Sequence, residues 1–441
     1  MSSPHPDARA LPAGPAKRGA PTVLLGALFS SCCFFLAVGA VLPVLPGFIG
    51  HRLAGGSLGI GWSYFAYSAA SIAIRPWVGR HLARAPVRPL VIAGLLVFAG
   101  SVAATAVATD VEVVVGLRIL AGAAEGAVYT GMLTEVISRL PHERRGRAIS
   151  YFSAAMWAGL AAGPVAGVVI VNALGYGRAW LALGALPVLA IAGCLPTHSG
   201  SSPGPAELRE AEQRPRFPMP TARSPRTRFF IMATSMPALT FALTMAGYSG
   251  FQSFIPIYGA QRGLTSAGGV FFAYGATVLL VRIVAASLSD RRQPEKLAAV
   301  GCVLNVLAMG VLITWARPIT IYASAVMLGL ALAIQYPSLL KLALAGADQS
   351  AHGQVIAVVS GAFDAGYGLG VIVIGATIAA AGFPAGLGLA TGFMILALGC
   401  HVLRFLTPSS LSSLGGINDR RISRRPDPAV VRRLHDDRSR L

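Results

Sequence analysis

Three charged side chains lie within long apolar stretches of the sequence: Arg118, Glu125 and Asp364. Glu125 follows Arg118 by seven residues, which places both side chains on one face of a helix, about two turns apart. A charge in an apolar helix is costly unless it faces a cavity or a partner, so all three residues are functional candidates. Burial disfavours the ionised form of a carboxyl group, and this suits an acid that gains and loses a proton.

Each of these charges also has a structural interpretation. Arg118 and Glu125 could form an ion pair that joins two helices, and Asp364 could hydrogen-bond to a neighbouring helix. A clustered catalytic set, such as Ser with His or paired acids on facing helices, is not found in the sequence. We therefore expect proton exchange rather than enzymatic catalysis, and no catalytic residue is assigned.

The composition places these residues in a membrane. The chain has 441 residues, of which 54% are hydrophobic and only 12% are charged. A soluble globular protein carries about 25% charged residues, so this chain lacks the polar surface that a water-facing body needs. Apolar runs of about 18 residues or more recur, and each can cross a bilayer as a helix. The composition predicts an all-α polytopic membrane protein over the alternative, a large soluble helical bundle.

Several other classes of site are disfavoured. The five cysteines lie in apolar runs without metal-ligand spacing, and no Gly-Lys dipeptide of a phosphate-binding Walker A loop occurs. The net charge of +19 suggests nucleic-acid binding, but the positive residues lie in short runs between apolar segments and at the two ends. That distribution is typical of membrane orientation. We expect no metal, no cofactor and no nucleic-acid partner.

Twelve transmembrane helices are predicted, with bounds of about 22–45, 58–80, 89–109, 111–136, 147–171, 178–196, 228–250, 265–288, 296–315, 318–345, 353–381 and 383–406. The domain organisation that follows is a disordered N-terminal tail (1–20), a six-helix half (21–196), a polar linker (197–228), a second six-helix half (229–406) and a basic C-terminal tail (407–441). The first apolar run is too long for a cleavable signal peptide, so we interpret it as an uncleaved span.

Nearly all Lys and Arg residues fall on the side of the membrane that carries both tails. On the other side lie only Arg52, Arg178, Arg262 and Arg317. Cationic loops are retained in the cytoplasm, so both termini are predicted to be cytoplasmic. We expect a multi-pass protein of the bacterial inner or plasma membrane.

The two halves repeat one layout at a constant offset of 207 residues (282 − 75). Arg75 corresponds to Arg282, and both follow an apolar run. The same offset relates Phe65-Ala66-Tyr67 to Phe272-Ala273-Tyr274, Tyr129 to Tyr336, Trp157 to Asp364, Gly159 to Gly366 and Gly163 to Gly370. An internal repeat of this length predicts two pseudo-symmetric six-helix bundles.

Twelve spans in two halves, with a basic loop repeated in each, resemble the major facilitator superfamily (MFS) of secondary transporters. The family's loop between spans two and three reads Gly, three residues, Asp, then a basic residue. Gly79 and Arg84 match it in the first half, where Ala83 replaces the acid, and Asp290 and Arg291 match it in the second half. The resemblance implies a cytoplasmic gate formed by Arg75, Gly79, Arg84, Glu135, Asp290 and Arg291, with Glu135 as partner of Arg75 or Arg84. The alternative is that these arginines anchor helix ends at the lipid headgroups.

Two further stretches resemble motifs of the family. Arg118 with Gly122 resembles a motif of span four whose arginine is implicated in proton coupling. The run from Gly159 to Gly167, which contains Gly163 and Pro164, resembles the signature of drug:proton antiporters. Physically, Gly159, Gly163 and Gly167 form a groove that another helix can approach closely, and Pro164 adds a bend.

The fold implied by the resemblance places a substrate cavity between spans one, four, seven and ten. Candidate lining residues are Tyr129, Tyr248, Gln252, Asn305, Gln335 and Tyr336. We expect proton-coupled efflux of a small, largely apolar organic compound by alternating access, as in drug resistance, carried out by a monomer in the lipid bilayer. The alternative on the same fold is a proton-coupled importer of a sugar or another metabolite.

Overall fold

The computed structural model describes residues 20–82, 85–138, 142–194, 225–285, 293–315, 317–345 and 352–406. Within these ranges the chain forms α-helices and one 3₁₀ turn, and no strand occurs. The helices are α1 (Ala20–Arg52), α2 (Gly56–Leu82), α3 (Val87–Ala104), α4 (Val111–Ser138), α5 (His142–Cys194), α7 (Pro225–Gln261), α8 (Ala267–Ala285), α9 (Pro294–Thr314), α10 (Pro318–Leu344) and α11 (His352–Leu406). The 3₁₀ turn Thr105–Val107 follows α3.

The outside of the bundle is apolar. Leu280 is 64% exposed, Leu396 58% and Leu189 56%, and many other large apolar side chains are similarly exposed. Such a surface is unfavourable in water and favourable in lipid. Six stretches of the described residues are long and apolar enough to cross a membrane, among them Tyr151–Cys194 and Val358–Arg404. The prediction of a polytopic all-α membrane protein agrees with this architecture.

Two helices, α5 and α11, are about twice the length that one crossing requires, and each bends at one glycine. A crossing takes about 20 residues, whereas α5 has 53 residues and α11 has 55. Gly175 in α5 has φ 70° and Gly382 in α11 has φ 80°, a left-handed conformation that favours glycine. These glycines are themselves 207 residues apart, and each lies between two predicted spans. Counted as single helices, the described elements number ten rather than the predicted twelve; the division into twelve crossings stays a prediction.

Two helices also extend further than predicted. α1 continues past residue 45 to Arg52, and α7 continues past residue 250 to Gln261. Proline lies inside both helices, at Pro43 and Pro46 in α1 and at Pro237 and Pro256 in α7. Membrane helices tolerate internal proline because neighbouring helices re-satisfy the freed backbone groups.

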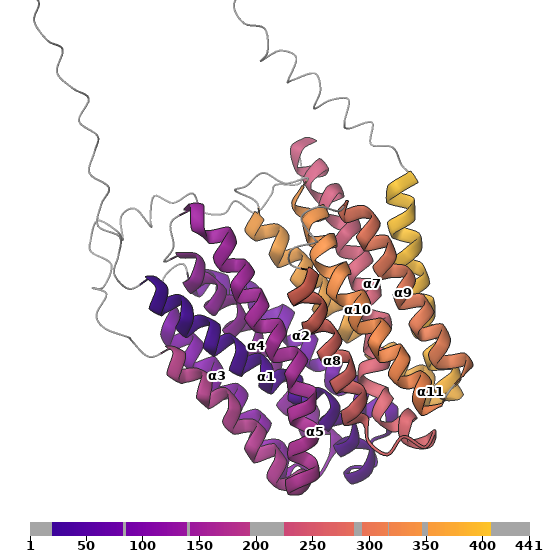
Figure 1. The fold of residues 1–441 in the computed structure, drawn as a ribbon. Helices are drawn as coiled ribbons and strands as arrows, with labels where there is room; N and C mark the ends of the chain where they lie inside the picture. The colour runs from indigo at the N-terminus through magenta and orange to yellow at the C-terminus, as the bar shows by residue number, and fades with distance from the viewer. Residues whose placement is uncertain are drawn as a thin grey trace, which may run out of the picture.

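The helices form two groups that lie side by side, α1–α5 and α7–α11 (Figure 1). In the first group α5 packs closely on α1, and in the second α11 packs closely on α7. A Cβ added to Gly163 would lie 2.6 Å from the Leu36 carbonyl oxygen, and one added to Gly370 would lie 2.5 Å from the Ala246 carbonyl oxygen. Because Gly163 and Gly370 are 207 residues apart, the same glycine packing occurs in both groups.

The two groups meet mainly along two helix pairs, α2 with α11 and α5 with α8, and α1 also contacts α7. At the first pair Gly368 lies against Ser68, and at the second Gly275 lies against Ala161. These contacts are related by the repeat, since Ser68 corresponds to Gly275 and Ala161 to Gly368. Ser57 also donates a hydrogen bond to the Gly375 carbonyl oxygen (3.0 Å) across the α2–α11 pair. The repeat therefore shapes the contact between the groups as well as each group.

Most of the predicted linker (197–224) and both predicted tails (1–19 and 407–441) lie outside the described residues, as do the gate residues Arg84, Asp290 and Arg291.

Candidate substrate and proton site

A cavity of about 90 Å³ lies between the two groups of helices. Its walls come from both groups and are mainly aromatic and aliphatic. Five tyrosines and one tryptophan contribute to the lining, namely Tyr64, Tyr67, Tyr248, Tyr274, Tyr367 and Trp157. Its polar and charged lining residues are Ser68, Arg118, Gln252 and Asp364. A mostly apolar pocket with few polar groups is typical of a site for a small organic molecule.

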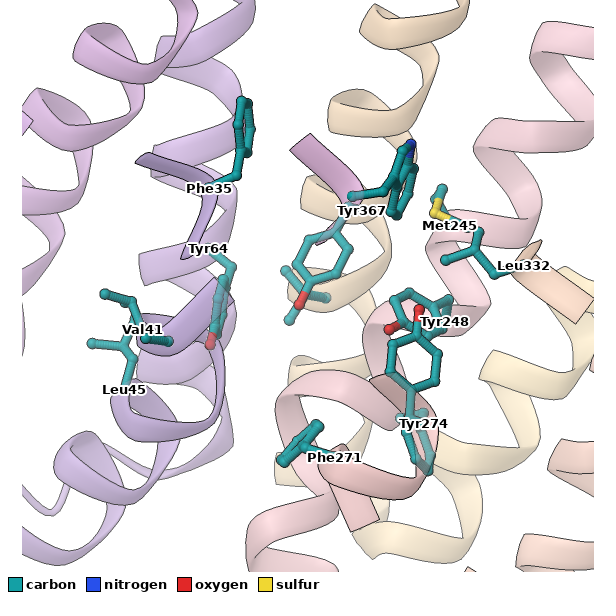
Figure 2. Close-up of a cluster of buried hydrophobic side chains, with 14 of the residues drawn as sticks. Phe35, Val41, Leu45, Tyr64, Met245, Tyr248, Phe271, Tyr274, Leu332 and Tyr367 are labelled. Carbon is teal, nitrogen blue, oxygen red and sulfur yellow. The ribbon is translucent and has the colours of Figure 1, made fainter. Parts of the chain in front are cut away.

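The aromatic lining is held by one ring contact across the groups and by further contacts within the second group. Tyr64 on α2 lies opposite the second-half tyrosines (Figure 2), and its ring centroid is 5.8 Å from that of Tyr367 on α11. The Tyr248 and Tyr274 rings are 5.5 Å apart, and the Tyr367 hydroxyl lies 3.1 Å from the Ser253 hydroxyl. Edge-to-face and tilted ring contacts of this kind stabilise a fixed aromatic surface.

One ion pair crosses between the groups beside the cavity. Arg75 on α2 donates to the carboxylate of Asp364 on α11. Asp364 is only 8% exposed. The Arg75 guanidinium also lies 5.7 Å from the centroid of the Tyr129 ring, and the Tyr129 hydroxyl is 3.3 Å from that of Ser360 on α11. Arg75, which was predicted to belong to the gate, thus forms an ion pair with Asp364, which was predicted to take part in proton coupling.

Glu125 is a second acid near the same arginine. Ser71 donates a hydrogen bond to a Glu125 carboxylate oxygen (2.6 Å), and Glu125 is 7% exposed. The charges of Glu125 and Asp364 both act on Arg75. Arg75 therefore contacts one carboxylate, that of Asp364, and lies within electrostatic reach of a second, that of Glu125, which comes from the other half of the chain.

Arg118 does not form an ion pair with Glu125, although both lie on α4. The Arg118 guanidinium lies 5.4 Å from the centroid of the Tyr67 ring and is 3% exposed. Its Nε and Nη2 atoms have no hydrogen-bond partner among the described residues. The predicted joint site of Arg118 and Glu125 is thus two sites, with Glu125 near Arg75 and Arg118 at the cavity wall.

Arg282 on α8 is the repeat counterpart of Arg75 and has different partners. Its guanidinium lies 4.6 Å from the centroid of the Trp157 ring on α5 and 5.9 Å from that of Tyr336 on α10. Trp157 is the counterpart of Asp364, and Tyr336 is the counterpart of Tyr129. The two halves therefore place an arginine at one shared position, against a carboxylate in one case and an indole ring in the other.

The remaining predicted gate residues contact other elements. Glu135 accepts a hydrogen bond from Arg88 on α3 (3.0 Å), whereas Arg75 uses Asp364. Of the two predicted partners of Glu135, Arg75 pairs with Asp364 instead, and Arg84 lies outside the described residues, so its pairing with Glu135 stays a prediction. Gly79 is exposed, and a Cβ there would contact nothing within 4 Å.

The predicted packing motif on α5 contacts α1. A Cβ on Gly159 would meet the backbone of Cys32 and Leu36, and one on Gly167 would meet that of Ala40. Pro164 lies inside α5 and is buried. The groove that Gly159, Gly163 and Gly167 form is thus filled by α1 in this structure.

The predicted lining residues separate into three groups. Gln252 and Tyr248 line the cavity. Tyr129 and Tyr336 lie instead beside the two arginines Arg75 and Arg282.

Asn305 and Gln335 are outside the cavity lining and join three helices. Asn305 donates to the Gln335 side-chain oxygen (2.9 Å), and Gln335 donates to the Thr244 hydroxyl (3.1 Å) and to the Cys302 sulfur (3.0 Å). Buried amides satisfied in this way stabilise helix packing. Their polar side chains suggested a contact with substrate, but these side chains form hydrogen bonds within the protein instead.

Sequence reasoning did not assign Tyr67, Ser71 or Trp157 to the site. A signal was present for Trp157, because the offset of 207 residues relates it to Asp364. Ser71 had no such signal: a serine in an apolar helix commonly bonds to its own backbone, and only the position of α4 brings it to Glu125.

Among the described residues, no group of three or more His, Cys, Asp or Glu side chains could hold a metal ion. The geometry on view is an ion pair between the two groups beside a mostly apolar cavity.

Comparison with known proteins identifies the fold. The profile of the Major Facilitator Superfamily matches residues 27–318 and 265–432. The chain belongs to this superfamily. It is a multi-pass membrane transporter and not an enzyme. Members bind small-molecule substrates in a lipid bilayer.

The sequence relatives of this MFS transporter include an uncharacterised MFS-type transporter of Burkholderia mallei. It is 26% identical over 368 residues, which cover 81% of this chain and 85% of the relative. The multidrug resistance protein 2 of Bacillus subtilis is 29% identical over 145 residues, or 33% of this chain and 35% of that protein.

Solved structures with the same fold include the nucleoside transporter NupG. The TM-score is 0.66 at 13% identity, with coverage of 87% of this chain and 99% of that one. The human organic anion transporter MFSD10 gives a TM-score of 0.60 at 17% identity, with coverage of 87% and 100%. At these identities the likeness concerns the fold.

Proposed function

We propose that this MFS transporter couples the movement of protons to the efflux of small organic compounds. The observation that carries the proposal is the ion pair of the half-buried Arg75 with the buried Asp364, which joins the two groups of helices beside the cavity. An acid in this position can be neutralised by a proton, and neutralisation removes the attraction between α2 and α11. Proton binding and relative movement of the halves are thereby linked.

Glu125 makes the exchange energetically feasible. A buried guanidinium without a negative partner is strongly destabilising, by about 3–5 kcal/mol. When Asp364 takes a proton, Glu125 can balance Arg75, because it already lies within electrostatic reach of that residue. When Asp364 releases the proton, Arg75 returns to it. The site therefore holds one proton on two acids without leaving a cation uncompensated.

The proposed cycle exchanges a proton for substrate. Asp364 or Glu125 takes a proton from the outer side as the substrate leaves the cavity. The protonated carrier reopens toward the cytoplasm, releases the proton and binds new substrate between the aromatic walls. The two halves rock against one another along the α2–α11 and α5–α8 contacts, which alternately exposes a central site.

Efflux is the preferred direction for two reasons. The glycines of α5 with Pro164 resemble the drug:proton antiporter signature, and one partial relative is a multidrug resistance protein. The mostly apolar cavity lining suits such cargo better than a sugar. The alternative is import of a metabolite. It takes support from the fold shared with a nucleoside transporter and from the polar lining residues Gln252 and Ser68.

The proposal includes an arrangement in the membrane. Twelve spans in two six-helix bundles, joined by a cytoplasmic linker, would place both termini in the cytoplasm of the inner or plasma membrane, in agreement with the distribution of Lys and Arg. α5 and α11 would each supply two spans, separated at Gly175 and Gly382. A monomer contains every residue of the proposed cycle.

The test begins with a deletion strain, which is screened against a compound panel with and without a proton uncoupler. Hypersensitivity to a compound indicates efflux, whereas loss of growth on a nutrient indicates import. The compound found is then transported into proteoliposomes under an imposed pH gradient. We expect Asp364→Asn and Glu125→Gln together to abolish pH-driven transport, and Asp110→Asn, which alters an exposed acid, to preserve it. Full pH-driven transport by the double variant would overturn the proposal.

A further inference from the structure

Among the described residues, the buried and half-buried charges around the cavity are unequal in number. Three arginines, Arg75, Arg118 and Arg282, stand against two acids: Asp364 pairs with Arg75, and Glu125 lies within electrostatic reach of the same arginine. Neither of the other two arginines forms an ion pair with a described residue; each lies over an aromatic ring instead. The region therefore carries a surplus of positive charge at a depth where charge is costly.

Arg118 is the surplus cation that lines the cavity. It is 3% exposed, and its Nε and Nη2 atoms have no hydrogen-bond partner among the described residues. A guanidinium has five N–H donors in a planar fork that matches a carboxylate. The contact with the Tyr67 ring satisfies one face of this cation and leaves donors at its edge unused.

A second unused donor lies beside it. The Tyr67 hydroxyl is buried and has no hydrogen-bond partner among the described residues, and Tyr67 also lines the cavity. Buried polar groups are nearly always hydrogen-bonded, so two orphaned donors at one cavity wall indicate a missing acceptor. The acid in the cavity lining, Asp364, is already engaged by Arg75.

We propose that Arg118 and Tyr67 bind the carboxylate of the transported compound, which is an aromatic organic anion. The aromatic part of the molecule lies against the rings of Tyr64, Trp157 and Tyr367, which line the same cavity. The Gln252 side-chain oxygen, also without a partner in the described part of the chain, accepts a hydrogen bond from a donor group on the compound. This inference rests on the proposed transport function and names its substrate class.

The test measures equilibrium binding to the purified full-length protein by calorimetry, at fixed pH and without a proton gradient. The probes are benzoate, 2-naphthoate and 9-anthracenecarboxylate, each paired with its neutral carboxamide. A charged hydrogen-bonded contact changes affinity by about 10- to 100-fold. We expect at least one carboxylate to bind about 10-fold more tightly than its amide.

Variants separate the proposed contact from a general effect of charge. We expect Arg118→Gln to remove the preference for the carboxylate while amide binding stays within about twofold, and Arg118→Lys to restore part of it. Arg178→Gln removes an exposed arginine and should leave the preference unchanged. Tyr67→Phe keeps the ring beneath Arg118 and removes only the hydroxyl, so it should weaken carboxylate binding about 3- to 10-fold. This variant also serves as the test if Arg118→Gln fails to fold.

The inference is overturned if no carboxylate binds more tightly than its amide, or if the preference survives in both Arg118→Gln and Tyr67→Phe. Because no gradient is applied, the result is independent of proton coupling. An intact carboxylate preference with no pH-driven transport would overturn the proposed function alone. Proton-driven transport of neutral compounds without the preference would overturn only this inference.

Discussion

Two arginines that are equivalent in the internal repeat lie at the contact between the two halves, and their partners differ in chemistry. In one copy Arg75 pairs with the carboxylate of Asp364, and in the other Arg282 lies over the indole ring of Trp157. Both arginines also lie near a tyrosine of the repeat, Tyr129 or Tyr336. A carboxylate can be neutralised by a proton, whereas an indole ring cannot. The repeat therefore supplies two equivalent contacts, and of these two only the Arg75–Asp364 contact contains a group that can take up a proton.

The surroundings of the two arginines support this distinction. Near Arg75, Ser71 and Glu125 provide a hydrogen-bonded second acid. The positions equivalent to Ser71 and Glu125 in the other half are Val278 and Leu332, which are both apolar. A buried acid without a partner is disfavoured, so polar support is expected where a charge is exchanged and apolar packing where it is not. The asymmetry thus extends through several positions.

The largest expected effect separates the two contacts by stability. Arg75→Gln leaves two buried carboxyl groups without their cation and should lower the free energy of unfolding by about 3–5 kcal/mol. Arg282→Gln removes a cation whose ring contact is worth about 2 kcal/mol, against the cost of burying it, so the net change should be below about 2 kcal/mol. Denaturant unfolding of the purified protein in detergent measures both. Equal losses would contradict the comparison, and Arg75→Gln with Asp364→Asn should recover most of the stability.

The glycine packing of α5 on α1 and of α11 on α7 should be equally sensitive to substitution, unlike the two arginine contacts between the halves. Gly163→Ala and Gly370→Ala each place a Cβ against the backbone of the facing helix. Overpacking of this kind costs about 1–3 kcal/mol. We expect similar losses in thermal unfolding midpoint from the two variants.

The control for this pair is Gly116→Ala on α4, where a Cβ meets nothing within 4 Å. It should be neutral or slightly stabilising, because alanine favours a helix over glycine by up to about 1 kcal/mol. A loss at Gly163 alone would mean that the two halves pack differently, contrary to the repeat.

The α5–α8 contact can be given the same chemistry as the α2–α11 contact by one substitution. Trp157→Asp places an acid opposite Arg282 and creates a second ion pair between the halves. Both pairs would then have to be neutralised, so pH-driven transport should slow by about 10-fold, or roughly 1.4 kcal/mol in barrier height, and depend more steeply on pH. Transport rates in proteoliposomes over a range of pH values measure this. An unchanged pH profile would show that the α5–α8 contact does not open during the cycle.

The smallest expected effect comes from Trp157→Phe. Phenylalanine keeps an aromatic face beneath Arg282 but provides a weaker cation–π contact than tryptophan. The weaker contact should lower the free energy of unfolding by less than about 1 kcal/mol, apart from the effect of the smaller ring on packing. Transport should keep its pH dependence, because no titrating group has changed. A loss of proton coupling in this variant would mean that Trp157 takes part in coupling, which contradicts the distinction between the two arginine contacts.

Much of the architecture follows from the sequence alone. Apolar runs with few charges require a membrane, and one offset of 207 residues, which holds from Phe65 to Gly163 of the first half, requires two matching halves. The offset also relates Trp157 to Asp364 before any helix is placed. The ends of the helices were predicted less accurately from the sequence. α1 and α7 run past their predicted ends because proline does not stop a helix that neighbouring helices support.

The partners of the charged residues were decided by the tertiary structure. The local spacing suggested Arg118 with Glu125, yet Glu125 lies with Ser71 and Arg75, while Arg118 lies on Tyr67 at the cavity wall. The physical reason is the distance along the chain over which sequence patterns act. Periodicity and composition act over a few turns of one helix and therefore fix which residues are buried. The ion pair between Arg75 and Asp364 depends on how the two halves pack against each other, and no local sequence pattern contains that information.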